Sequence, residues 1–188
     1  MTLLITGLVL WVATHMFKRT APAARARLQS RLGDGSKGVV AAVLLVALVL
    51  MVLGYRHADV VVLWQGPLWL VHVNNLLMIV AVFLMGVGNS KCRARGWLRH
   101  PMLTAVVVWS VAHLLVNGDL PSLVLFGGLL VWAVAEMVII NRAEPDYHPF
   151  SGGTLGGDMR LAAITAAVFV VVVLLHGWLG PSPFGAQL

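Results

Sequence analysis

The sequence has few charged residues and a single cysteine, and both features limit the kinds of protein that it can be. Of its 188 residues, 11% are charged whereas 60% are hydrophobic, and the mean hydropathy is +0.91. This is more apolar surface than a soluble domain of that size can bury, so the composition predicts an integral membrane protein. The single cysteine, Cys92, excludes a disulfide or a thiolate metal cluster within one chain. No Walker-type phosphate loop, internal repeat or low-complexity tract is present.

Six apolar stretches make up most of the chain. They cover about residues 2–17, 38–55, 68–87, 101–116, 120–140 and 160–179. Each is long enough, or nearly so, to cross a hydrocarbon core of about 30 Å at about 1.5 Å per residue. The first stretch would suit a signal peptide, but its basic residues follow the apolar run instead of preceding it, which favours a helix. We therefore expect an all-α fold: one domain over residues 1–188, a polytopic membrane bundle of six transmembrane helices.

Basic residues lie almost entirely on one side of this expected bundle. Residues 18–37 hold six Lys and Arg, residues 91–99 hold four, and Arg142 and Arg160 flank the last loop on that side, whereas the other side has Arg56. The positive-inside rule places the basic side in the cytoplasm, so both termini are expected on the outer side, which in a bacterial inner membrane is the periplasmic side. The net charge of +6 then indicates topology and contact with membrane lipid, and does not point to nucleic acid.

Local signals mark the boundaries of the fourth and fifth helices. Pro101 suits the first helical position, and it disfavours helical geometry at the preceding His100. Gly118 suits the end of that helix, and Asp119 can cap the next one, with Pro121 in its first turn. The two helices are therefore expected to form a tight hairpin on the outer side.

Two histidines fall inside predicted helices at similar depth. His113 lies about 18 Å from the inner edge and His15 about 18 Å from the outer edge, so in a core of about 30 Å their depths differ by about 6 Å. Two imidazoles can ligate one haem iron axially, and Trp11, Trp109 and Trp132 lie at a depth where they would wall an apolar macrocycle. Alternatively, the two histidines only hydrogen-bond or pack against neighbouring helices.

Charged side chains near the inner interface have roles that the sequence leaves open. Arg19, Arg99 and His100 can hold haem propionates or an anionic lipid head group, although positive-inside topology alone would also place them there. Glu136 can neutralise Arg99 or His100, or hold propionate-facing arginines in place around it; a structural ion pair is favoured over a protonation site.

Three further features are noted without an assigned role. His72 and His176 each lie in the outer third of a predicted helix, where a second haem, a quinone site, a proton relay or a simple interface position all fit. The segment 141–158 looks like a mobile internal loop or lid.

Particular blocks of the sequence resemble the NnrU family. The fourth predicted helix begins RHP, contains Trp109 and AHLL around His113, and ends in Asn-Gly-Asp. In the first, His15 is followed four residues later by Arg19 and then by the basic stretch RARLQSRLGDGSKG. The resemblance spans nearly the whole chain and is more specific around His113 than in the last helix.

This resemblance implies a bacterial inner-membrane protein associated with denitrification and nitric oxide metabolism. The family's plant and cyanobacterial relative is the zeta-carotene cis-trans isomerase, a haem b enzyme whose redox state controls activity. The resemblance implies haem b as cofactor and His15 and His113 as axial ligands. Ser110 stands where the isomerase has a cysteine implicated in ligand switching, so thiolate exchange is not expected here.

The sequence thus predicts a haem b-binding membrane protein with His15, His113, Arg19, Arg99, His100 and Trp109 at the cofactor. Its expected ligand is a hydrophobic polyene or isoprenoid, undergoing redox-controlled isomerisation, or nitric oxide. The alternative is a non-enzymatic scaffold or transport component without a cofactor. Membrane methyltransferases also begin a helix with RHP, but they carry further cofactor-binding residues after it, so this class fits the chain less well.

Overall fold

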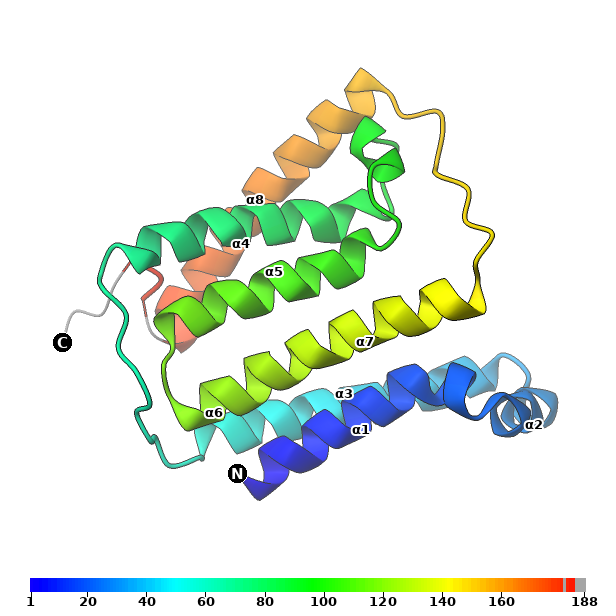
Figure 1. The fold of residues 1–188 in the computed structure, drawn as a ribbon, viewed down its shortest axis with the longest axis horizontal. Helices are drawn as coiled ribbons and strands as arrows, with labels where there is room; N and C mark the ends of the chain where they lie inside the picture. Colours follow the sequence, from blue (N-terminus) through cyan, green and yellow to red (C-terminus); the bar gives the residue numbers. More distant parts are fainter. Residues whose placement is uncertain (181, 185–188) are drawn as a thin grey trace.

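The computed structural model describes residues 1–180 and 182–184, and within them the chain is all-α (Figure 1). In chain order the elements are α1 (Thr2–Thr20), α2 (Pro22–Leu32), α3 (Gly35–Arg56), α4 (Leu70–Val87), the short 3-10 helix η1 (Arg93–Gly96), α5 (Pro101–Val116), α6 (Leu120–Ser122), the π-helical turn η2 (Leu123–Gly127), α7 (Gly128–Ala143) and α8 (Leu155–Leu179). The segments α6, η2 and α7 follow one another without a break. The described ranges contain no β-strand, only an isolated bridge between Val62 and Asp119.

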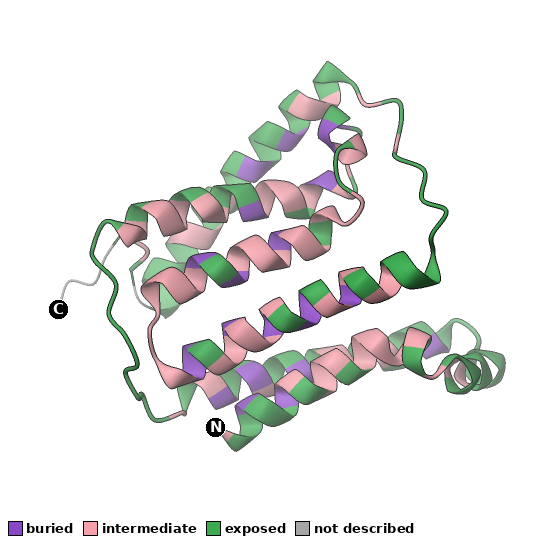
Figure 2. Ribbon diagram, viewed as in Figure 1, coloured by how far each residue is buried: buried purple, intermediate pink, exposed green. Residues whose placement is uncertain are grey.

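Within residues 1–180 and 182–184, four helices are long and apolar enough to cross a membrane: α3, α4, the run from α6 to α7, and α8. Helix α5 is apolar but shorter, at 16 residues. Large apolar side chains are exposed along these helices, and Figure 2 shows α8 as mostly exposed. Such surfaces suit contact with lipid, because helices satisfy their own backbone polar groups there. A membrane-type all-α fold is therefore confirmed, whereas spans by α1 and α5 stay predictions.

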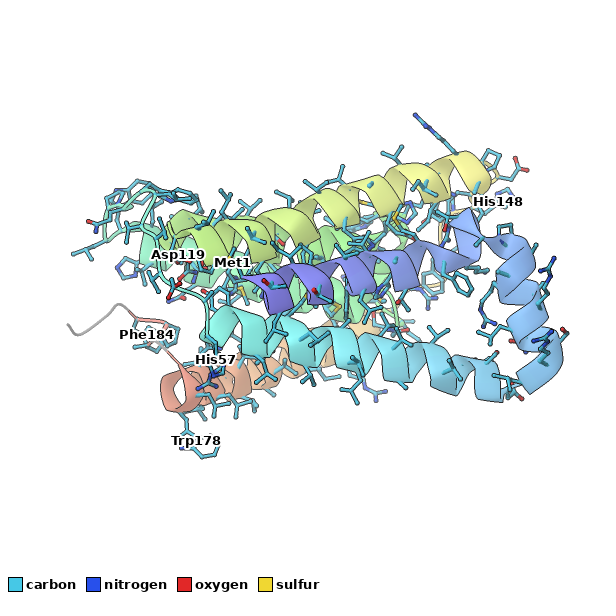
Figure 3. The ribbon with its side chains drawn as sticks, turned by 90° about the horizontal axis from the view of Figure 1, so that it is seen from below. Met1, His57, Asp119, His148, Trp178 and Phe184 are labelled. Atoms are coloured by element: carbon cyan, nitrogen blue, oxygen red, sulfur yellow. The ribbon has the colours of Figure 1, made fainter. Side chains whose placement is uncertain are left out.

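The two ends of the bundle differ in what they carry. In Figure 3, Met1, His57, Asp119 and Phe184 lie toward one end and His148 lies at the other. The lysines and arginines, apart from the one that ends α3, belong to segments at the His148 end. The start of α1 and the end of α8 thus share the weakly charged end, as the six-helix topology requires. The assignment of that end to the periplasm remains an expectation from the positive-inside rule.

Helices α1 and α3 pack closely because a glycine on each helix lies against the backbone of the other, where a side chain would not fit. A Cβ atom on Gly54 would collide with the backbone of Leu4, and one on Gly7 would come 2.7 Å from the backbone nitrogen of Met51. Small residues allow this approach between membrane helices, where packing replaces the hydrophobic effect as the driving force. Helices α4 and α5 form the other extensive pair, α7 packs between α5 and α1, and α8 packs mainly on α4.

Helix ends follow the local signals in the sequence. Helix α5 begins at Pro101 and ends before Asn117, and the Asp119 carboxylate caps the next helix by accepting from the Ser122 backbone N–H at 2.8 Å. Helix α2 was not expected. It has no buried residue, so no apolar face marks it in the sequence. Its ends carry the usual signals: Pro22 is its first residue, and Gly33, with a φ of 53°, follows its last.

Helices α7 and α8 are longer than predicted, so the loop between them shortens to residues 144–154. This loop lies against the connection between α4 and α5. The Thr154 backbone N–H donates to the Lys91 carbonyl oxygen at 3.0 Å, and the Arg95 guanidinium lies 4.4 Å from the centroid of the Phe150 ring. The loop therefore lies along the connection that leads into α5.

Candidate functional site

His113 faces a cavity of 430 Å³ between α4, α5, η2 and α8. Its Nδ1 lies 2.9 Å from the Trp109 carbonyl oxygen, one turn earlier on α5. Because a carbonyl can only accept, Nδ1 carries the proton and Nε2 of the neutral ring is left as an acceptor. Metal-bound histidines are commonly oriented in this way by a hydrogen bond from the other ring nitrogen. The His113 ring is thus held with one nitrogen available for a ligand.

The π-helical turn η2 supplies the surface on which His113 rests. Phe126 from this turn stacks on the imidazole, with centroids 4.5 Å apart and planes 27° apart, and it also meets Trp109 edge-on at 4.9 Å. A π turn adds one residue to the helical repeat and is frequent at functional sites. The sequence analysis missed this element, because its apolar residues LVLFG read as ordinary membrane helix.

Polar residues from other helices share the cavity with His113, His176 and Asn74 among them. The His176 ring, from α8, has its centroid 6.4 Å from that of His113. Asn74, from α4, has a buried Oδ1 atom with no hydrogen-bond partner among the residues that the structure describes. Most of the remaining wall is aliphatic or aromatic. The cavity therefore combines an apolar lining with a few polar groups, the usual composition of a cofactor or small-molecule site.

His15 lies in a different setting, on α1. Its Nδ1 is 3.0 Å from the Trp11 carbonyl oxygen, so this ring too is oriented from its own helix. The imidazole contacts the indole rings of Trp11 and Trp132, with centroids 4.4 and 4.7 Å away. Both indole N–H groups are buried and lack an acceptor in the described part of the chain.

The two predicted axial ligands do not share a ring neighbour in the structure. His113 contacts Trp109, whereas His15 contacts Trp132, and these two tryptophans belong to one apolar cluster on α5 and α7. Counting residues along helices estimated the depth of each histidine but not its lateral position. The pairing of His15 with His113 therefore stays a prediction.

Glu136 forms the ion pair expected of it, and its partner is Arg19. The Arg19 Nη1 to Glu136 Oε1 distance is 2.9 Å, and Glu136 is 5% exposed. Glu144 lies on the other guanidinium nitrogen, 3.5 Å away. The second carboxylate oxygen of Glu136 and Nε of Arg19 are buried without a partner in the described ranges. The pair joins α1 to α7 one turn below His15.

Arg99 and His100 contact the loop and the end of α7 instead of Glu136. The Arg99 guanidinium donates to the Glu144 carbonyl oxygen and lies 5.0 Å from the Tyr147 ring. His100 Nε2 is 2.8 Å from Asn141 Oδ1. Arg19 and Arg99 thus meet at Glu144, so the structure brings these two predicted residues together at the end of α7.

A family model described as NnrU protein matches residues 3–183. The chain belongs to the NnrU family. No curated protein and no solved structure matches it. Family membership and the four apolar helices together indicate that this NnrU family member is a membrane protein.

The donor set of this NnrU family member suits a cofactor that brings its own equatorial ligands. Within residues 1–180 and 182–184, no three His, Cys, Asp or Glu side chains gather as they would around a bare metal ion. A haem needs one or two axial donors from the protein, which an oriented imidazole supplies. His72 is exposed on α4 and is not part of the His113 cavity. The residues around His113 therefore fit a haem.

Proposed function

We propose that this NnrU family member binds haem b within a bacterial inner membrane. His113 is one axial ligand; a second histidine can complete the coordination, and the family resemblance implies His15 for that place. The observation that carries the proposal is the free Nε2 of His113, on a ring fixed by Trp109 and Phe126 at the edge of a 430 Å³ cavity. That volume lies within the range of about 300–1,000 Å³ typical of small-molecule and cofactor sites. When bound, the haem supplies a redox-active iron whose open or exchangeable position takes a ligand.

Further cavities along α4 and α8 support a long apolar ligand beside this haem. A cavity of 300 Å³ shares Met78 and Trp109 with the His113 cavity, and one of 440 Å³ shares Thr165 with it in turn. Their linings are almost entirely apolar, so they suit hydrocarbon in preference to water. This row of adjacent cavities favours a polyene or isoprenoid as substrate, with redox-controlled cis-trans isomerisation as the reaction.

A diatomic ligand would need little of that space. Nitric oxide is therefore the second candidate, as a ligand of an iron held by His113, and the association of the family with denitrification supports it. In that role the apolar cavities would serve as a path for gas from the lipid.

The test is the absorbance spectrum of the protein purified in detergent, oxidised and then reduced with dithionite, with a pyridine haemochrome assay. We expect near-stoichiometric haem b in the wild type and its loss or gross perturbation in His113→Ala. His57→Ala is a matched control, because Nδ1 of His57 lies 2.8 Å from the Leu53 carbonyl oxygen in the same arrangement, on an exposed ring at the end of α3. This variant should keep the wild-type spectrum.

Two results would contradict the proposal. One is a colourless wild type after expression with ample haem supply. The other is a His113→Ala protein that keeps both its folded yield and its full spectrum. A colourless protein would favour the scaffold or transport component, in which the histidines are packing residues.

A further inference from the structure

The imidazole nearest to His113 is on α8. His176 and His113 line the same cavity, with ring centroids 6.4 Å apart and planes 52° apart. His15, in contrast, contacts Trp11 and Trp132 and is not part of that cavity. We propose that His176 is the second axial ligand of the iron and takes the place that the family resemblance gives to His15. This inference rests on the proposed haem site.

The His176 side chain is available for this role. It is exposed, and its ring nitrogens have no hydrogen-bond partner among the described residues. Its neutral ring therefore offers a nitrogen lone pair without breaking an existing bond. An unpaired imidazole on an apolar helix is costly in a membrane and usually serves a site, as the aromatic and aliphatic surroundings of His176 suggest.

The chain after α8 holds His176 at the mouth of the cavity. The Asn75 amide donates to the Pro183 carbonyl oxygen at 2.8 Å, which ties this segment to α4. Ser182 and Pro183 line the cavity beside His176. The segment after α8 is thus tied to α4 beside the cavity by a contact outside the imidazole pair.

Coordination by His176 would add a contact to α8, a helix that otherwise packs against few other elements. Helix α8 packs on α4 and touches η1, while most of its large apolar side chains are exposed (Figure 2). An iron shared by His113 and His176 would link α8 directly to α5. Haem loading should therefore slow amide exchange in the second half of α8, a signature that a haem held between α1 and α5 would not give.

His15 then has a structural role. It fills the space between Trp11 and Trp132, one turn from the Arg19–Glu136 pair, and so stabilises the contact between α1 and α7. Its substitution should lower folded yield without changing the spin state of the haem iron.

The experiment compares His176→Ala, His15→Ala and the control His72→Ala, each loaded with haem b in detergent. Absorbance and electron paramagnetic resonance report the spin state of the ferric iron, and deuterium exchange of the peptide covering residues 170–179 reports the attachment of α8. We expect the wild type, His15→Ala and His72→Ala to be low-spin. His176→Ala should keep haem on His113, become high-spin, lose the protection of α8, and regain a low-spin spectrum with added imidazole.

The outcomes separate this inference from the function on which it rests. A low-spin His176→Ala protein beside a high-spin His15→Ala protein would overturn it and restore the His15–His113 pair. Low-spin spectra in all three variants would also overturn it, while leaving haem binding intact. A colourless wild type would overturn the proposed function, and this inference with it.

Discussion

Breaking the buried pair between Arg19 and Glu136 should be among the more damaging single changes in the protein. The side chains are 22% and 7% exposed, so neither charge is fully solvated if its partner is lost. Removing one member of such a pair costs about 3–5 kcal/mol, whereas replacing both by apolar residues is often close to neutral. We therefore expect Arg19→Met to lower the free energy of unfolding by about 3 kcal/mol, with Glu136 left uncompensated. The double variant Arg19→Met, Glu136→Leu should recover most of this, a coupling of at least about 2 kcal/mol.

The assay is unfolding by denaturant in mixed micelles, followed by tryptophan fluorescence, since Trp11 and Trp132 lie within two turns of the pair. A matched cycle uses Arg93→Met and Asp158→Asn, a pair with 2.5 Å between Nε and Oδ2 whose arginine is 60% exposed. That cycle should show no coupling that survives added salt. Coupling of about 0.6 kcal/mol for Arg19 and Glu136, the average for hydrogen-bonded pairs inside membrane proteins, would refute the reasoning.

Two further predictions use the same unfolding measurement. The Thr165 hydroxyl is buried without a partner in the described chain, so Thr165→Val should leave the free energy of unfolding unchanged or raise it by about 1 kcal/mol; a clear loss would show that the hydroxyl has a ligand or water partner. Asp119→Ala removes the cap that accepts from the Ser122 N–H and hydroxyl, and should cost about 1–2 kcal/mol. Asp119→Asn, which keeps an acceptor oxygen, should cost less, and equal losses in the two variants would contradict the capping argument.

Features set by neighbouring residues in the chain were predictable from the sequence. The start of α5 at Pro101 and the cap at Asp119 depend on proline geometry and on one side chain reaching the next turn. The apolar runs gave the helices for the same reason, because hydropathy is a local property. The charge asymmetry between the two ends also follows from the sequence alone, since it requires only the order of loops.

Features set by lateral packing were not predictable in this way. Counting along α1 and α5 gives the depth of His15 and His113 in the membrane. It does not show that the tryptophans beside them, Trp132 and Trp109, pack in one apolar cluster. The short distance between His176 and His113 depends on how α8 packs against α4, and no local sequence signal specifies that packing. The π turn at η2, which brings Phe126 onto the His113 ring, has no signal in its apolar sequence. The sequence left the ion-pair partner of Glu136 open because that partner also depends on lateral packing of the helices.

The place of α8 in the chain order has a consequence for how the protein is made. A membrane protein is synthesised from its N-terminus, so α8 leaves the ribosome after α1 to α7. One wall of the His113 cavity comes from that helix, so a nascent chain that already contains α1 to α7 lacks a closed pocket. The proposed haem could therefore be captured only once α8 has been made. A chain stopped before Leu155 would insert its earlier helices and still be unable to retain it.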